Sequence, residues 1–190
     1  MVGRVTIVAH RRGTTNDQLA QAWRELGIDA RIVVPRQAAV EVSPGDVVLA
    51  RLDVLDTLDG IEPGLEVVDA LAGRGARILN RADALRAAHD KLETSFRLQE
   101  AGLPHPRTVH VVRPGDAVDM PAPWVVKPRH GSWGKDVFRC LSEGELADCL
   151  EAVRDRSWFR SHGALVVGST GTGAKLALRA IVYQTTRARP

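Results

Sequence analysis

The chain has 190 residues, of which 44% are hydrophobic, and its formal net charge is +3. This length and composition suit one large folded domain or two small ones, and they exclude a disordered chain. No apolar run approaches the ~20 residues that span a bilayer. The N-terminus also lacks the apolar core of a signal peptide, so we expect a cytoplasmic protein.

The charge is unevenly distributed along the chain. All 23 acidic residues lie within positions 1–155, whereas positions 156–190 carry six Arg or Lys residues and no acid. The basic character therefore belongs to the last part of the chain and says little about the main body. Nucleic-acid binding is the weakest of the functions we consider, because six cations without interleaved aromatic residues neutralise few phosphates.

The first eighty residues alternate between strand and helix patterns. Apolar, β-branched runs predict strands at Val5–Ala9, Ala30–Val34, Asp46–Ala50 and Arg77–Leu79, and helical periodicity appears at Asn16–Leu26 and Leu65–Leu71. This alternation predicts an α/β domain with a small open parallel sheet, flanking helices and right-handed crossovers.

The first turn after a strand contains three cations, His10, Arg11 and Arg12. It has no Gly-x-Gly-x-x-Gly pattern, so we reject a dinucleotide site there. The turn presents cations at the end of the strand, and an arginine can hold a carboxylate through a bidentate pair. A solvated cationic loop is the alternative interpretation.

The middle of the chain predicts helices and then strands. Helices are expected at Ala82–Ala88, Lys91–Glu100 and Glu143–Arg154, and strands at Thr108–Val112, Trp124–Lys127 and Val137–Cys140. The helix that Lys91 opens should bury Leu92, Phe96 and Leu98, and Gly102 followed by Pro104 should end it.

The strongest chemical signal is the predicted hairpin of Trp124–Lys127 and Val137–Cys140. Its loop contains Gly131, Ser132, Trp133 and Gly134, and Lys127 precedes it. The glycines let backbone N–H groups approach phosphate oxygens, and the lysine brings a positive charge. The pattern therefore predicts a site for the polyphosphate of a nucleotide. Ser132 could donate a hydrogen bond to phosphate, and Trp133 could either cover the site or pack elsewhere.

Two segments in this order resemble the ATP-grasp ligases, especially the branch that contains the ribosomal-protein glutamate ligase RimK. One is the lysine-led helix that ends in Gly-Leu-Pro-x-Pro-x-Thr, and the other is the Val-Val-Lys-Pro-x-x-Gly-Ser-x-Gly hairpin. The resemblance covers about residues 1–165. It implies an N-terminal open parallel sheet, called the pre-ATP-grasp domain, followed by a small α+β nucleotide-binding subdomain.

The resemblance also implies residue roles and a reaction. Lys91 and Lys127 would contact the phosphates of ATP, and the loop residues Gly131, Ser132, Trp133 and Gly134 would lie over them. The strand ends of the N-terminal domain would face the acceptor substrate, so the resemblance implies that His10, Arg11 and Arg12 could hold a substrate carboxylate. In this family a carboxylate attacks the γ-phosphoryl group of ATP, and an amine captures the resulting acyl phosphate. The expected partners are small-molecule or peptide carboxylates and amines. Neither a catalytic residue nor an oligomeric state is indicated.

The later motifs of the family are not found in this chain. The resemblance leads one to expect a Gln-Glu-aromatic hinge for adenine, an Asp-x-Arg segment and a Glu-x-Asn that holds magnesium. No acid follows Asp155, so the magnesium expected for the family has no ligands that we can identify. We therefore expect the C-terminal catalytic half to be missing and this chain to be inactive alone. Asp136 and Glu143 lie near the loop in sequence, and we expect both to be solvated.

These patterns predict three parts: a pre-ATP-grasp domain at 1–80, a nucleotide-binding part at 81–166 and an atypical basic tail at 167–190. Either the chain is a short form, or its reading frame changes near Val166; the second is favoured because acids and family motifs vanish together. We expect the tail not to form the family's central strand and hinge. A nucleotide-binding module without catalysis is the alternative function.

Two further motifs carry no chemistry in our interpretation. The Gly-rich run after Val167 resembles a P-loop, but Ala174 separates Gly173 from Lys175 and Leu176 replaces the required hydroxyl. Cys140 and Cys149 show no Cys-x-x-Cys spacing and are expected to be reduced, structural thiols.

Overall fold

The computed structural model of this chain describes residues 4–168. The chain forms two compact units. Among the described residues, the first consists of 4–53 and Ile61–Arg86, and the second consists of Val54–Gly60 and 87–168. A short segment of the first half of the sequence therefore belongs to the second unit.

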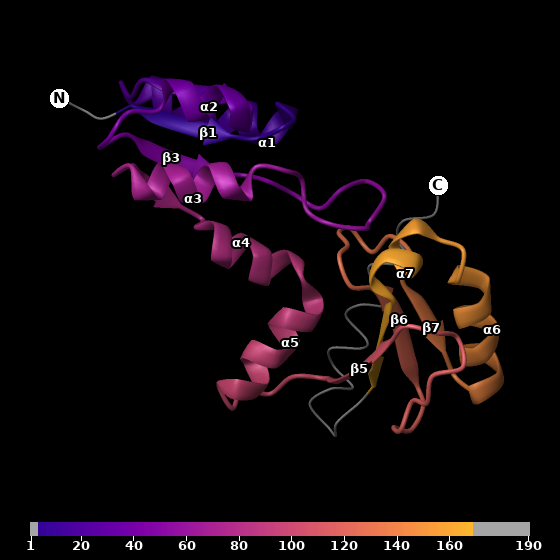
Figure 1. Cartoon of the computed structure of the whole chain (residues 1–190). Helices are drawn as coiled ribbons and strands as arrows, with labels where there is room; N and C mark the ends of the chain where they lie inside the picture. Colours follow the sequence, from indigo (N-terminus) through magenta and orange to yellow (C-terminus); the bar gives the residue numbers. More distant parts are fainter. Residues whose placement is uncertain (1–3, 169–190) are drawn as a thin grey trace. The chain divides into compact units, whose positions relative to one another are not determined.

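The first unit contains a four-stranded, fully parallel sheet in the order β2-β1-β3-β4. In register, Val5 of β1 pairs with Ala30 of β2 and with Val47 of β3. The parallel sheet expected from the sequence is confirmed. Its strands are β1 (Val5–Val8), β2 (Ala30–Val33), β3 (Val47–Ala50) and β4 (Arg77–Leu79) (Figure 1).

Helices cover both faces of this sheet because successive strand residues point to opposite sides. Ile7 packs with Ala20 of α1 (Gly13–Glu25), whereas Val8 packs with Ala38 of α2 (Pro35–Glu41) and Leu71 of α3 (Leu65–Gly73). Helix α4 (Ala82–His89) follows β4 and buries Ala82 and Leu85 beside α3. The sequence did not predict α2, whose first residue is a proline.

The second unit contains an antiparallel sheet in the order β5-β8-β6-β7. Its β6–β7 pairing places Trp124 opposite Cys140 and Val126 opposite Phe138, so the predicted hairpin is confirmed. The strands are β5 (Arg107–Val111), β6 (Trp124–Pro128), β7 (Phe138–Cys140) and β8 (Ala164–Gly168).

One face of this sheet packs on α6 (Glu143–Val153) and α7 (Ser157–His162). Trp124 and Val126 of β6 form the core there with Leu150 and Trp158 from the two helices. Leu58, from the Val54–Gly60 segment, joins this core at 4% exposure. The other sheet face carries Val125, Leu165 and Val167, with Leu92 packed against them.

Helix α5 (Lys91–Glu100) has the bounds that the sequence predicts. It starts because the Asp90 carboxylate accepts hydrogen bonds from the N–H groups of Leu92 and Glu93, and it ends before Gly102, whose φ is +65°. The expected burial of Phe96 is wrong, since this side chain is 53% exposed. Of the predicted apolar positions Leu92, Phe96 and Leu98, only Leu92 packs against a core cluster of the described residues.

Strand β8 is the last element that the structure describes. Strand β8 extends to Gly168, which includes the first two residues of the predicted tail. The expectations for the remaining tail, including the degenerate P-loop, fall on 169–190 and lie outside the described residues. Among residues 4–168, no helix has the length and apolar character needed to cross a membrane.

Candidate functional site

Lys91 and Lys127 are the central residues of the candidate site, and the second unit brings them together. Lys91 is the first residue of α5, and its Nζ donates a hydrogen bond to the Gly131 carbonyl at 2.5 Å. Lys127 lies on β6, on the same sheet face as Val125 and opposite Leu165 of β8. The predicted loop and both predicted lysines therefore meet at the end of one hairpin.

Both ammonium groups lie in a partly desolvated setting. Burial lowers the pKa of Lys91, and the nearby charge of Lys127 lowers it further, to about 8. Burial also lowers the pKa of Lys127. Among the described residues, the Lys127 ammonium has neither a hydrogen bond nor an ion pair. Two close cations in a partly desolvated setting form a site that a polyanion would stabilise.

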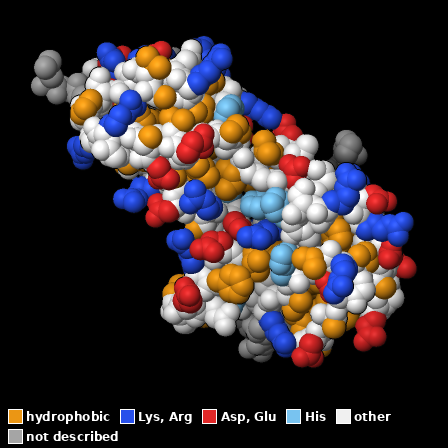
Figure 2. All heavy atoms as spheres, viewed as in Figure 1, with side chains coloured by type: hydrophobic (Ala, Val, Ile, Leu, Met, Phe, Trp, Pro, Cys, Tyr) orange, Lys and Arg blue, Asp and Glu red, His pale blue; other side chains and the backbone are white. Residues whose placement is uncertain are grey.

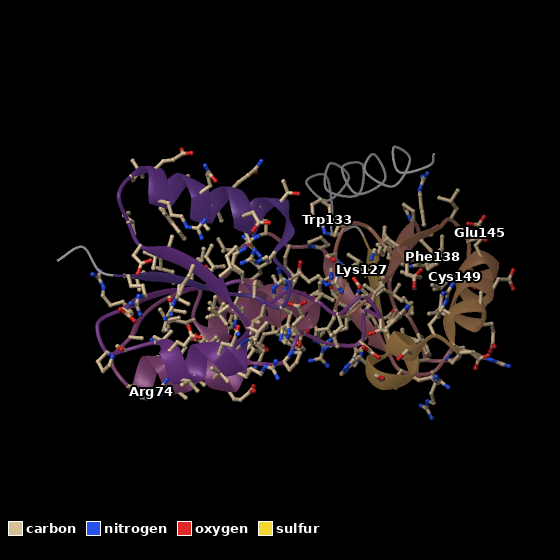
Figure 3. The ribbon with its side chains drawn as sticks, turned by 90° about the horizontal axis from the view of Figure 1, so that it is seen from above. Arg74, Lys127, Trp133, Phe138, Glu145 and Cys149 are labelled. Atoms are coloured by element: carbon tan, nitrogen blue, oxygen red, sulfur yellow. The ribbon has the colours of Figure 1, made fainter. Side chains whose placement is uncertain are left out.

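The loop between β6 and β7 has an unusual backbone. Trp133, Gly134 and Asp136 adopt left-handed φ values of +58°, +69° and +52°, and the Lys135 N–H donates to the Ser132 carbonyl at 3.2 Å. A left-handed tryptophan is uncommon because a bulky side chain crowds its own backbone there. Trp133 is 89% exposed and belongs to the same unit as Lys127 (Figure 3).

Two side chains attach this loop to other parts of the second unit. The Asp136 carboxylate accepts a hydrogen bond from the Trp158 indole at 2.8 Å, so the expectation that Asp136 is simply solvated is wrong. Lys135 lies 3.9 Å from Asp56, and both of these side chains are more than half exposed. Asp136 thus holds the loop to α7, whereas the Lys135 contact is a weak surface pair.

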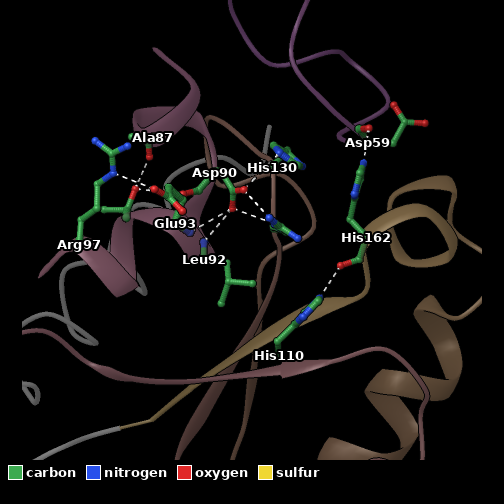
Figure 4. A network of polar contacts seen from close by, with 11 residues as sticks. Asp59, Ala87, Asp90, Leu92, Glu93, Arg97, His110, His130 and His162 are labelled. Carbon is green, nitrogen blue, oxygen red and sulfur yellow. Dashed lines mark hydrogen bonds and ion pairs between the residues drawn. The ribbon is translucent and has the colours of Figure 1, made fainter. Parts of the chain in front are cut away.

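An ion pair between Asp90 and Arg129 fixes the distance between the two lysine-bearing elements. Arg129 donates from Nε to Oδ1 at 2.8 Å and from Nη2 to Oδ2 at 2.6 Å, so the pair is bidentate. The same Asp90 carboxylate caps α5, and the Lys91 N–H donates to the Arg129 carbonyl at 3.1 Å. We call this pair the Asp90–Arg129 clamp. Figure 4 shows Asp90 with Leu92 and Glu93, the first residues that it caps.

Electrostatics keep this clamp charged. Burial raises the pKa of Asp90, but hydrogen bonds from Arg129 and the Glu93 N–H outweigh burial and leave the pKa below its ordinary value. The Asp90 side chain is only 9% exposed. This pair was not predicted from the sequence. An Asp before a helix is a recognisable cap signal, whereas nothing local marks Arg129 as its partner.

His130 lies beside the clamp and is buried, with 8% exposure. Its Nδ1 has no hydrogen-bond partner among the described residues, and its ring packs edge-on against that of His162, with centroids 4.8 Å apart. Burial is the main reason that the pKa of His130 is lowered. A neutral ring is therefore favoured, which keeps another positive charge away from Lys91.

His162 connects this region to the Val54–Gly60 segment. Its Nε2 donates to the Asp59 carbonyl at 2.8 Å, while the Ser157 hydroxyl donates to the Asp59 carboxylate at 2.5 Å. His110 in turn donates from Nε2 to the His162 carbonyl at 2.7 Å. Hydrogen bonds from Ser157 and Thr57 lower the pKa of Asp59. Figure 4 shows how these contacts extend from β5 to the segment.

The predicted carboxylate site lies in the first unit. His10, Arg11 and Arg12 are all exposed between β1 and α1. The His10 Nε2 donates to the Pro63 carbonyl at 2.7 Å, which orients this ring, and Asn16 donates to the Arg11 carbonyl at 3.0 Å. A role for these three residues in substrate binding remains a prediction.

The described part of the chain shows no ready metal site. Within residues 4–168, no three or more His, Cys, Asp or Glu side chains form a group that could hold a metal ion.

Cys140 of β7 and Cys149 of α6 are free thiols that lie near each other in the second unit. Burial raises the pKa of Cys140 and raises that of Cys149 to about 12. Both thiols therefore stay protonated and unreactive.

Comparisons with known proteins identify the architecture. The search of family models returned no match. The structure is similar to a RimK-domain ATP-grasp protein from Sphaerobacter thermophilus, with a TM-score of 0.59 and 21% identity over 90% of this chain and 65% of that one. It is also similar to a carboxyaminoimidazole ribonucleotide synthase from Aspergillus clavatus, solved with ATP, with a TM-score of 0.65 and 16% identity over 88% and 47% of the two chains. The chain has the ATP-grasp fold.

A curated sequence relative supports the RimK-like resemblance. A tetrahydromethanopterin:α-L-glutamate ligase from Methanosarcina acetivorans is 30% identical over 112 residues, which is 54% of this chain and 34% of that protein. The resemblance to ATP-grasp ligases stated from the sequence is confirmed, as is the α/β fold, in which a parallel sheet is followed by an antiparallel sheet as in the ATP-grasp neighbours. This ATP-grasp chain spans about a third of the curated relative and less than two thirds of the structural neighbours. The proteins it matches are ligases, and ligases are enzymes.

Proposed function

We propose that this chain supplies the nucleotide-binding part of an ATP-dependent carboxylate–amine ligase, and that ATP binds at Lys91, Lys127 and the loop Gly131–Gly134. The observation that carries this proposal is the pair of desolvated lysines, one without any partner among the described residues and the other bonded only to a loop carbonyl. The ligase relatives support the class of reaction.

The chemistry that these residues can perform is positioning and charge neutralisation. Phosphoryl transfer needs little covalent help from the protein, but it needs cations that hold the transferred group in line with its acceptor. Lys127 would neutralise one phosphate from the sheet, and Lys91 another from the helix start. The Asp90–Arg129 clamp joins the start of α5, which carries Lys91, to the end of β6, which carries Lys127. Loop N–H groups beside Gly131 and Gly134 would donate to phosphate oxygens.

Magnesium does not fit the side chains that surround these lysines. Octahedral magnesium is usually bound through one or two carboxylates together with phosphates. The nearest acid, Asp90, is committed to Arg129 and to the cap of α5, and residues 4–168 offer no acidic cluster. We therefore assign no step of the reaction to a metal held by this part of the chain.

Binding of ATP is the direct test. Calorimetry on the intact chain should detect ATP, and Lys127→Ala should weaken the affinity about tenfold to a hundredfold, because a charged hydrogen bond contributes roughly 1.5–3 kcal/mol. Lys135→Ala is the matched control, since this lysine belongs to the same loop but is exposed and only weakly paired. Its effect should be less than threefold, by the roughly 0–1 kcal/mol of surface pairs.

The outcomes separate the possibilities. Unchanged affinity in Lys127→Ala would remove the nucleotide assignment. ATP binding that needs Lys127, together with phosphate release that depends on an added carboxylate and amine, would support the full ligase. ATP binding without such release from the intact chain would favour the non-catalytic module instead.

A further inference from the structure

The first unit has a cavity of about 430 Å³ that the nucleotide site does not use. It lies at the carboxyl ends of the parallel strands: His10 follows β1, Arg36 follows β2, and Glu66 belongs to the first turn of α3, which follows β3. From β1 the chain first adds β2 on one side and then returns to add β3 on the other side of β1. The strand order therefore reverses between β1 and β3. Open α/β sheets bind ligands outside the strand ends at such a point. The volume is also typical of small-molecule sites.

The inner lining of the cavity is apolar and preformed. Val34, Pro35, Pro63 and Val67 provide hydrocarbon surface. The Gly64 backbone packs closely on Pro35: a Cβ placed on Gly64 would lie 2.5 Å from the Pro35 Cγ. Gly64 has a φ of +120°, a conformation that L side chains rarely adopt. This contact joins the start of α2 to the start of α3 and fixes the base of the cavity.

The exposed rim carries charges of both signs. Arg36 and Glu66 are exposed lining residues, and within the described part of the chain neither side chain forms a hydrogen bond or ion pair. They also form no ion pair with each other, which leaves both free for a ligand. His10 donates its Nε2 proton to Pro63, so its Nδ1 is the ring nitrogen left for a further contact.

We propose that this cavity binds an α-amino acid with an apolar side chain. Its carboxylate would pair with Arg36, its ammonium with Glu66, and its side chain would lie on Val34, Pro63 and Val67. An acidic side chain would be disfavoured because its second carboxylate would lose water on an apolar surface without a partner. The inference rests on the proposed function, since carboxylate–amine ligation is the reaction that would use such an amino acid.

Binding can be measured on the intact chain without ATP. L-Leucine should give saturable shifts of first-unit resonances in NMR titrations. 4-Methylpentanoate, which lacks the ammonium, and 3-methylbutylamine, which lacks the carboxylate, should each bind at least about tenfold more weakly, because each loses one charge-assisted contact. L-Glutamate should also bind at least about tenfold more weakly than L-leucine.

Substitutions test the two charges separately. Arg36→Gln and Glu66→Gln should each weaken L-leucine binding at least about tenfold. Arg74→Gln is the control, because this exposed arginine follows the opposite end of α3 (Figure 3). It should leave the affinity unchanged. Thermal melts will show that the variants are folded, as expected for exposed side chains.

Calorimetry with ATP on the same proteins distinguishes the two hypotheses. If ATP binds but L-leucine does not, or if L-leucine binds equally well to Arg36→Gln and Glu66→Gln, the cavity inference is wrong and the nucleotide assignment stands. If ATP does not bind, the proposed function fails, whatever the amino-acid result. Equal binding of L-leucine and 4-methylpentanoate would overturn the role of Glu66.

Discussion

The Asp90–Arg129 clamp can be tested by removing its partners one at a time. Asp90→Asn keeps an oxygen that can cap α5 but removes the charge, whereas Asp90→Ala removes both. Arg129→Ala leaves the Asp90 carboxylate with its two backbone donors but no cation. Each variant removes a different part of one arrangement, so their free energies of unfolding can be compared directly.

The magnitudes follow from exposure and from the number of contacts. Breaking a fully buried ion pair costs roughly 3–5 kcal/mol. Asp90 is 9% exposed but Arg129 is 29% exposed, so we expect about 2 kcal/mol for Asp90→Asn. Asp90→Ala should cost about 1 kcal/mol more, which is the usual contribution of a helix cap.

Urea unfolding followed by tryptophan fluorescence is a suitable assay, because Trp124, Trp133 and Trp158 all belong to the second unit. Arg81→Ala provides the control. The side chains of Arg81 and Asp83, which form an ion pair, are 73% and 59% exposed, so this substitution should cost less than about 0.5 kcal/mol. A double-mutant cycle of Asp90→Ala and Arg129→Ala should give a coupling above about 1 kcal/mol. A coupling near zero would refute the claim that the clamp holds α5 to β6.

Two further predictions concern Lys91 and Gly163. Burial and the charge of Lys127 lower the pKa of Lys91 from an ordinary 10.5 to about 8. Between pH 8 and pH 10.5 the unfolded chain therefore binds more protons than the folded chain. The free energy of unfolding should rise with pH over this range, from about 8 to 10.5. Lys91→Met should reduce that rise in urea titrations, while the lowered pKa of Lys127 keeps part of it. An identical pH profile in the variant would contradict the assignment. Gly163 has a φ of +66°, and a Cβ there would lie within 3 Å of the Val111 carbonyl oxygen, so Gly163→Ala should destabilise the second unit by more than about 2 kcal/mol. Gly144→Ala, in α6 with open space, should change stability by less than about 1 kcal/mol in the same melts, and equal effects of the two would count against this steric argument.

Local patterns were sufficient to predict most of the secondary structure. Helix α5 and strand β4 have the predicted bounds, and the hairpin of β6 and β7 differs by a residue at its ends. These elements have strong periodicity and clear stop signals such as Gly102. Helices α2 and α7 were missed because each has fewer than eight residues and depends on packing rather than on its own pattern.

The candidate site could be proposed from the sequence only where its residues form a motif. Lys127 and the loop glycines were proposed from the hairpin pattern, and Lys91 from the resemblance to a known family. Arg129 and His130 lie next to this motif, yet their partners are about forty residues away in sequence, and only the fold shows the contacts. Phe96 was assigned to the core from helical spacing, but that spacing does not show which neighbour covers the face.

The Val54–Gly60 segment determines how the gene for this protein can be divided. A fragment that begins at Ala87 would contain every strand of the second sheet but would lack Leu58 and Asp59. Its core would lose one buried leucine, which typically costs roughly 2–5 kcal/mol when replaced by a small residue. Ser157 and His162 would also lose their acceptors. The second unit is thus discontinuous in sequence, so it can be transplanted into another protein only if the loop that follows β3 is transplanted with it.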